Sequence, residues 1–202
     1  MLTIDKSQEW EAIEKRMSKI VDRIGTHIDP GIMHAVVAFN AVGICTNASC
    51  EGHMDHGAAY PWIDIGSPNI DELAQKICWL LHEGRREDEE TKRLQKQHRL
   101  LYLQEEQRLV ALLGTFYQYH QMVYDRHLAI WRFSNGAPRL QSHGAEYQQF
   151  RDPDERAQKL KEYQQEMQAF ATFLKMGFFG ESDFDEAEYP VGQAADLLGM
   201  RR

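Results

Sequence analysis

The sequence has few cysteines, no long apolar run and no excess of positive charge. It contains three cysteines among 202 residues, an odd number that does not suit a framework of disulfide bonds. No stretch of about eighteen apolar residues occurs, so no membrane-spanning helix is expected. Residues 1–6 lack the apolar core of a signal peptide, and we therefore expect a cytoplasmic protein with reduced thiols.

Acidic residues outnumber basic ones by 31 to 23, which gives a formal net charge of −8. Phosphate groups would on average be repelled, so nucleic acid and anionic membranes are not expected partners. Apolar residues make up 43% of the chain and charged residues 27%, which is typical of a folded soluble protein.

The first eighty residues mix helical and strand patterns. Apolar side chains recur every three or four residues over 7–24, which predicts a helix, and a nearly all-apolar helix follows at 30–42. Residues 44–53 and 60–65 read as two strands of a hairpin with a loop at 54–59. A further helix is predicted at 67–84.

Two helix starts carry the same signature, an aspartate followed by a proline. Asp29-Pro30 and Asp152-Pro153 both place a capping side chain before a proline in the first turn. The second start is followed by apolar residues at helical spacing as far as Gly177.

From about residue 86 the composition shifts to Glu, Gln, Lys, Arg and Leu, and no strand pattern is evident. A single helix from 86 to 133 would be roughly 70 Å long, so we expect a break near Gly114. The helix at 153–177 is expected to pack antiparallel on it. Five acids among residues 181–188 indicate a solvated tail.

These patterns predict an α+β fold in which a small antiparallel sheet is packed by helices and followed by a long antiparallel helical hairpin. The predicted domains are a small α+β domain at 1–84, the helical hairpin at 85–180 and an acidic, flexible tail at 181–202. Apolar stripes on the hairpin exceed what the small domain can cover, so a homo-oligomer, first of all a homodimer, is expected.

Residues 45–56 concentrate the reactive side chains of this sequence. The stretch reads Cys-Thr-Asn-Ala-Ser-Cys-Glu-Gly-His-Met-Asp-His. One hypothesis is a zinc site, or a site for another divalent metal, because thiolates and imidazoles separated by short gaps are typical zinc ligands. Its candidate ligands are Cys45, Cys50, His53 and His56.

A second hypothesis follows from the alternation of side chains along a strand. If the loop is 54–59, His53 lies opposite Tyr60 and Glu51 lies opposite Trp62. One face of the hairpin would then form a polar pocket, metal-free or transiently metallated, built on Glu51, His53 and Asp64, while Cys50 on the other face would be a buried core residue. The ligand-binding candidates on the polar face are Ser49, Glu51, His53, Tyr60, Trp62 and Asp64.

The third interpretation is structural: the hairpin is a capped turn whose histidine satisfies a buried carbonyl or carboxylate group. The sequence leaves these three alternatives open. It also has no phosphate-binding glycine loop and no G-x-S-x-G motif, so it does not indicate whether the protein is an enzyme.

Three short segments together resemble the N-terminal region of uncharacterised bacterial and phage proteins. They are Phe39-Asn40-Ala41-Val42-Gly43-Ile44, Ser49-Cys50-Glu51-Gly52-His53 and Pro61-Trp62-Ile63. Ser49, Cys50 and Gly52 also match a Ser-Cys-x-Gly strand of the wybutosine-synthesis tRNA methyltransferase family, although His53 replaces that family's arginine. The resemblance implies a helix–strand–hairpin unit, and does not carry over methyltransferase activity.

The expected function is a metal- or small-ligand-binding protein that uses the 45–65 hairpin. The alternative is a non-catalytic protein-interaction module of a mobile-element or stress system, in which the helical hairpin binds the partner.

Overall fold

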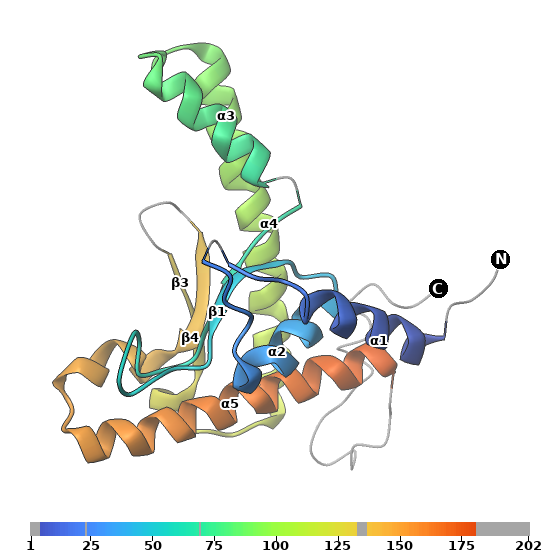
Figure 1. The fold of residues 1–202 in the computed structure, drawn as a ribbon, viewed down its shortest axis with the longest axis vertical. Helices are drawn as coiled ribbons and strands as arrows, with labels where there is room; N and C mark the ends of the chain where they lie inside the picture. The colour runs from blue at the N-terminus through green and yellow to red at the C-terminus, as the bar shows by residue number, and fades with distance from the viewer. Residues whose placement is uncertain (1–4, 23, 69, 133–136, 181–202) are drawn as a thin grey trace.

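The computed structural model describes residues 5–22, 24–68, 70–132 and 137–180 (Figure 1). The predicted tail at 181–202 lies outside these residues. Within them the fold is α+β, as the sequence predicts, with one four-stranded antiparallel sheet and helices packed around it. The described helices include none that is both long enough and apolar enough to cross a bilayer.

The sheet has the strand order β1-β2-β4-β3, and all its neighbours are antiparallel. Ile63 and Leu140 pair across the sheet centre, Ile130 pairs with Leu140, and both Ile63 and Leu140 are fully buried. The strands are β1 (Thr46–Cys50), β2 (Trp62–Ile65), β3 (Leu128–Arg132) and β4 (Pro138–Ser142). Because β2 pairs with β4, the sheet joins residues on both sides of the domain boundary predicted at residue 84.

Three helices pack together beside the sheet: α1 (Lys6–Met17), α2 (Pro30–Ala41) and α5 (Pro153–Phe179) (Figure 1). The predicted helix starts at Pro30 and Pro153 are both confirmed. Phe39 of α2 and Phe170 of α5 meet edge to face with ring centroids 5.8 Å apart. This layer fixes the first turn of α2 against the hairpin, which places the site described below.

Helix α3 (Ile70–His82) packs on the first half of α4 (Glu89–Tyr119), and the pair projects from the body of the molecule (Figure 1). We call this projection the arm (residues 70–103). The last turns of α4 return to the core, where Phe116 and Phe170 lie 5.2 Å apart. Between α4 and α5 the chain forms β3 and β4 and the short helices η1 (Tyr124–Arg126) and η2 (His143–Phe150).

Three details of the predicted helices are wrong. Helix α1 ends at Met17 rather than near residue 24, because the Asp22 carboxylate accepts hydrogen bonds from the Ile24 and Thr26 amides and builds a turn. Helix α4 runs through Gly114 without a break, since that glycine lies on an exposed face in open space. The helix then stops at Tyr119, and residues 128–132 form strand β3 instead of continuing it.

Candidate metal-binding site

Three donor side chains from separate parts of the chain converge at the end of the β1–β2 hairpin. Asp29 precedes α2, Cys50 ends β1, and His53 follows after a turn. Their ligand atoms all lie within 4.8 Å of one another, and the His53 Nε2 atom is 3.3 Å from the Asp29 Oδ2 atom. The site is half-buried, with 22% of the His53 side chain and 25% of the Asp29 side chain exposed. We call these three residues the inner set.

Asp29 occupies the N-cap position of α2 but does not cap its own helix. Its Oδ2 atom accepts a hydrogen bond from the Glu51 backbone amide at 3.1 Å and faces His53. Glu51 takes over the capping role, because its Oε2 atom accepts from the Gly31 amide at 2.6 Å. An N-cap aspartate ordinarily accepts from its own first turn, so this exchange turns the Asp29 carboxylate toward the histidine.

Gly52 makes it sterically feasible for Cys50 and His53 to face the same site. Its φ of +86° lies in the left-handed region, which interrupts the alternation of an extended strand. A Cβ atom on Gly52 would lie 2.6 Å from the Leu160 Cδ1 atom and 2.7 Å from the Tyr60 carbonyl carbon. Only glycine therefore fits here, and the turn that it permits brings the thiol and the imidazole together.

The Cys50 thiol is held in its protonated form. Its burial raises the pKa, and the charges of Asp29 and Glu51 raise it further, while a hydrogen bond from the Gly52 amide to Sγ at 3.3 Å acts in the opposite direction. The same carboxylates that disfavour a thiolate would favour a bound cation. The environment therefore suits a metal ligand better than an activated nucleophile.

A second donor set shares His53 and lies nearer to solvent. It consists of His53, Asp55 and His56, which we call the outer set. The rings of His53 and His56 stack with centroids 4.2 Å apart. The His56 Nδ1 atom lies 2.8 Å from the Asp55 carboxylate, and this contact lowers the pKa of Asp55. Both of these loop side chains are mostly exposed.

The inner set faces a cavity of about 420 Å³ between the hairpin, the start of α2 and the segment that follows α1. The volume lies within the range of about 300–1,000 Å³ that is common for small-molecule sites. Besides Asp29, Cys50 and His53, the wall includes Ile28, Val36, Trp62, His27 and His56. A group bound at the inner set would therefore be reachable by a small ligand.

The hairpin register differs by one residue from the predicted one. Cys50, not Glu51, pairs with Trp62, and Ala48, not Ser49, pairs with Asp64. A shift of one residue exchanges the two faces of a strand, so the predicted polar face does not form. The prediction that Cys50 is a core residue is also wrong, since its side chain is only half-buried.

The residues proposed for the polar face go to different places. Asp64 accepts two hydrogen bonds from the Arg139 guanidinium at 2.6 and 2.9 Å, and that guanidinium stacks on Trp62 at 3.6 Å from the ring centroid. Ser49 pairs with Ile63 and, like Trp62, lines the cavity that the inner set faces, whereas Tyr60 lines a different cavity. Of the six, only His53 supplies a donor to the inner set.

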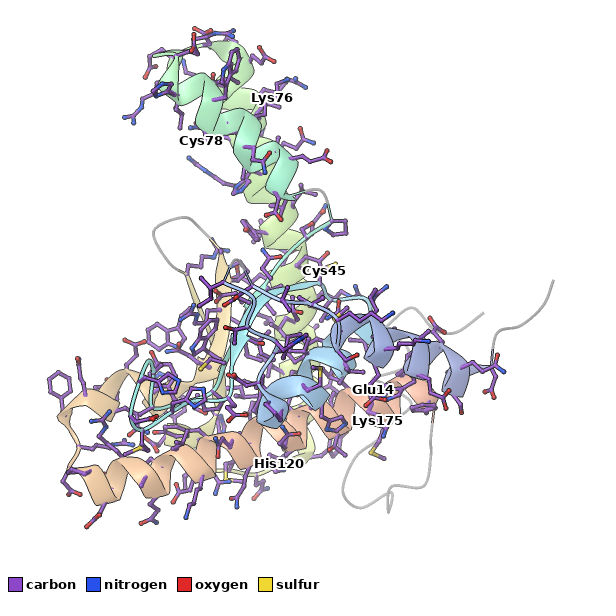
Figure 2. The ribbon with its side chains drawn as sticks, in the orientation of Figure 1. Glu14, Cys45, Lys76, Cys78, His120 and Lys175 are labelled. Carbon is purple, nitrogen blue, oxygen red and sulfur yellow. The ribbon has the colours of Figure 1, made fainter. Side chains whose placement is uncertain are left out.

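Among the four predicted metal ligands, Cys50 and His53 belong to the inner set and His56 to the outer one. Cys45 belongs to neither of the sets among the described residues. Figure 2 shows Cys45 beside the sheet and Cys78 on the distant arm, so neither accompanies Cys50 at the site. The candidate ligand that sequence reasoning missed is Asp29, whose Asp-Pro signature is fully explained by a helix start and gives no hint of a second role.

Comparisons with models of known protein families, with curated proteins and with solved structures found no match for this chain. The resemblance of its Ser-Cys-x-Gly-His segment to bacterial and phage proteins remains a prediction.

Proposed function

We propose that this protein binds a divalent transition-metal ion, zinc first of all, through the Asp29 carboxylate, the Cys50 thiolate and the His53 imidazole. The observation that carries the proposal is the convergence of these three donors within 4.8 Å from three separate positions in the chain. One sulfur, one nitrogen and one oxygen donor form a mixed set that suits zinc better than calcium or magnesium, which prefer oxygen alone.

The fourth position of a tetrahedral ion would face the cavity of about 420 Å³. His56 lines that cavity and stacks on His53, so it is the nearest additional imidazole that could supply a fourth ligand. If solvent holds that position instead, three protein ligands with one open site are the arrangement of catalytic zinc centres, in which the ion acidifies a bound water molecule. Both arrangements, with His56 or with solvent as the fourth ligand, require the inner set.

Metal analysis of protein purified without a histidine tag tests the proposal. The wild type is expected to retain about one zinc per chain, while Cys50→Ser and His53→Ala retain less than about a tenth. Cys78→Ser is the matched control, because Cys78 is exposed on the arm, and it should leave the metal content unchanged. Reconstitution with cobalt should give a thiolate charge-transfer band in the wild type and in Cys78→Ser but not in Cys50→Ser. A metal-free wild type that also fails to bind added zinc or cobalt would contradict the proposal.

A second candidate function is self-association through the arm, which is supported by an exposed apolar surface. Leu100 is 47% exposed and Leu103 is 37% exposed, and both line a groove of about 880 Å³ together with Ile77 and Leu81. We take a second copy of the chain as the partner. Light scattering should then report a dimer that Leu100→Glu converts to a monomer, while a wild type that stays monomeric at high concentration would exclude this candidate.

A further inference from the structure

A second cavity, of about 370 Å³, lies on the other side of the 53–59 loop from the metal-binding site. It is open to solvent on one side and is bordered by residues 57–60, by η2 and by the first turn of α5. Gly57 contributes to both cavities, but none of the inner-set residues lines this one. Its lining is mostly polar and includes one side chain of each charge, Arg156 and Glu146.

Gln148 forms the buried floor of this cavity, with 2% of its surface exposed. Its Nε2 group donates to the Ala59 carbonyl oxygen at 2.9 Å and to the Arg156 carbonyl oxygen at 3.5 Å, which fixes the orientation of the amide. The Oε1 atom is buried and has no hydrogen-bond partner among the described residues. Since buried acceptors are almost always paired, this oxygen is an unsatisfied acceptor in the wall of the cavity.

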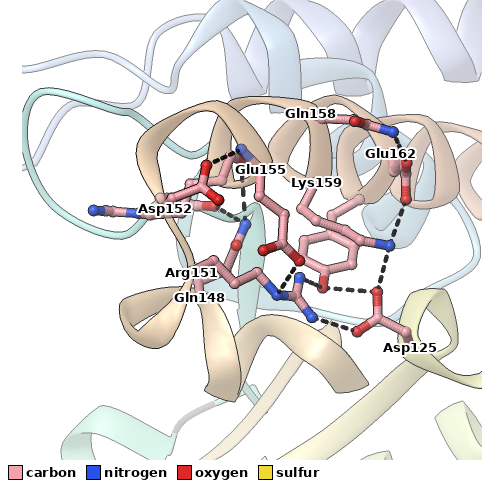
Figure 3. A network of polar contacts seen from close by, with 11 residues as sticks. Asp125, Gln148, Arg151, Asp152, Glu155, Gln158, Lys159 and Glu162 are labelled. Carbon is pink, nitrogen blue, oxygen red and sulfur yellow. Dashed lines mark hydrogen bonds and ion pairs between the residues drawn. The ribbon is translucent and has the colours of Figure 1, made fainter.

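Arg156 differs from the other cations at the start of α5. Arg151 binds the Asp125 carboxylate at 2.8 Å, and Lys159 bridges Asp125 and Glu162 at 2.9 and 2.8 Å (Figure 3). Arg156 lies between these two residues in the sequence, yet it has no ion pair with any described carboxylate, and its Nε group is buried without a partner. Its positive charge is therefore not paired with any described carboxylate.

Glu146, which carries the negative charge, lies at the edge of this cavity. The Glu146 Oε1 atom accepts from the Gln141 Nε2 group at 2.8 Å, which holds the carboxylate beside the opening. Burial raises the pKa of the neighbouring Tyr60, and the charge of Glu146 raises it further, which places this carboxylate close to the phenol. Glu146 and Arg156 line the same cavity without forming an ion pair with each other.

We propose that this cavity binds a small zwitterion, namely a free α-amino acid. Its carboxylate group would pair with the Arg156 guanidinium, and its ammonium group would pair with the Glu146 carboxylate. Guanidinium is the preferred partner of carboxylates in proteins, and charge-assisted hydrogen bonds are the strong ones. The cavity is at the lower end of the size range of ligand pockets, which suits a molecule of this class.

Saturation-transfer NMR on the intact protein tests the proposal with L-alanine, L-glutamine and L-phenylalanine as probes. At least one probe should receive saturation, and glycine should displace it. Acetate and methylamine each keep only one of the two charges, so each should compete at least about tenfold less well than glycine. A result in which no amino acid binds, or in which acetate or methylamine alone competes as well as glycine, would overturn the proposal.

Variants locate the binding. Arg156→Gln and Glu146→Gln should each weaken binding of the probe by about tenfold or more, whereas Lys96→Gln, on the exposed face of the arm, should leave it unchanged. Equal affinity in the wild type and all three variants would place the ligand elsewhere and overturn the assignment. Cys50→Ser should bind the probe as the wild type does. The test of amino-acid binding is therefore independent of the proposed metal site.

Discussion

The inner and outer donor sets share His53 but are built in different ways. The outer set lies within four consecutive residues of one loop, so its members are neighbours in the sequence as well as in space, although Asp55 is not among the predicted ligands. The inner set needs α2, β1 and a glycine turn to bring Asp29 to Cys50 and His53. The difference shows that a cluster in sequence marks the neighbourhood of a site, whereas the partly buried donor set depends on the tertiary fold.

The largest effect is expected from Gly52→Ala. A Cβ at this position would collide with Leu160 and the Tyr60 carbonyl carbon, and the φ of +86° would be strained. The two costs together should lower the free energy of unfolding by about 2–5 kcal/mol. Metal binding should be lost as well, because the inner set depends on this turn.

Gly57→Ala is the matched control for that variant, since Gly57 also has a positive φ but nothing lies within 4 Å of the place that a Cβ would take. It should cost only about 1 kcal/mol for the left-handed backbone. Urea denaturation measures both values. Equal losses in the two variants would mean that the close packing at Gly52 is not what builds the inner set.

Asp29→Asn and Asp55→Asn separate the two donor sets. Loss of the anionic inner ligand should weaken zinc binding on the order of 100-fold, which corresponds to roughly 2.7 kcal/mol. Asp55 is exposed and belongs to the outer set alone, so its replacement should change the affinity by less than about threefold. Competition with a chromophoric chelator gives both constants, and the opposite ranking would assign the ion to the outer set.

The pH dependence of metal binding should report the Cys50 proton. Because the pKa of this thiol is raised above its ordinary value, zinc must displace a proton throughout the neutral range. Affinity should therefore rise by about tenfold per pH unit between about pH 6 and 8 from this group alone. The slope of the logarithm of zinc affinity against pH should fall by one in Cys50→Ser and stay unchanged in Cys78→Ser.

The same raised pKa has a consequence for the stability of the metal-free protein. The folded state holds the thiol proton more tightly than the unfolded state does, so this contribution to stability is complete below the unfolded pKa. It is lost as the pH rises through the unfolded value toward the folded one. Denaturation of the metal-free wild type should therefore show a decline above about pH 8.5 that is smaller in Cys50→Ser.

Glu51→Gln should have the smallest effect. The amide oxygen can still accept from the Gly31 amide, so the cap of α2 survives, and the loss in stability should be below about 1 kcal/mol. Glu51→Ala removes the acceptor and should cost up to about 2 kcal/mol. If neither change is measurable, Glu51 does not cap α2, and another explanation is needed for the orientation of Asp29.

The fold is predictable from sequence where local signals are strong. Asp29-Pro30 and Asp152-Pro153 mark helix starts that the structure confirms, and the hairpin at 44–65 is present although both strands are shorter. Strand β3 is missed by sequence reasoning, because the long helical pattern that precedes it is extended to residue 133, although Leu128 and Ile130 have the two-residue spacing of a strand. Only pairing with β4, a partner about ten residues further along the chain, reveals them as a strand.

The site is predictable in part. Residue type and spacing identify Cys50 and His53, but the predicted register of the hairpin is wrong by one residue, which exchanges its faces. Asp29 could not be found, because a capping aspartate and a metal ligand look the same in sequence. The two roles are distinguished only in the structure, where the Glu51 carboxylate, just after the end of β1, caps α2 by accepting from the Gly31 amide. The Asp29 carboxylate accepts instead from the Glu51 amide.

X-ray absorption at the zinc edge of the reconstituted protein tests the inner set most directly. Coordination by Cys50, His53 and Asp29 predicts one sulfur at about 2.3 Å and the remaining nitrogen and oxygen ligands at about 2.0–2.2 Å. The sulfur contribution should vanish in Cys50→Ser. A spectrum of the wild type with nitrogen and oxygen ligands only would place the ion at the outer set and contradict the proposed site.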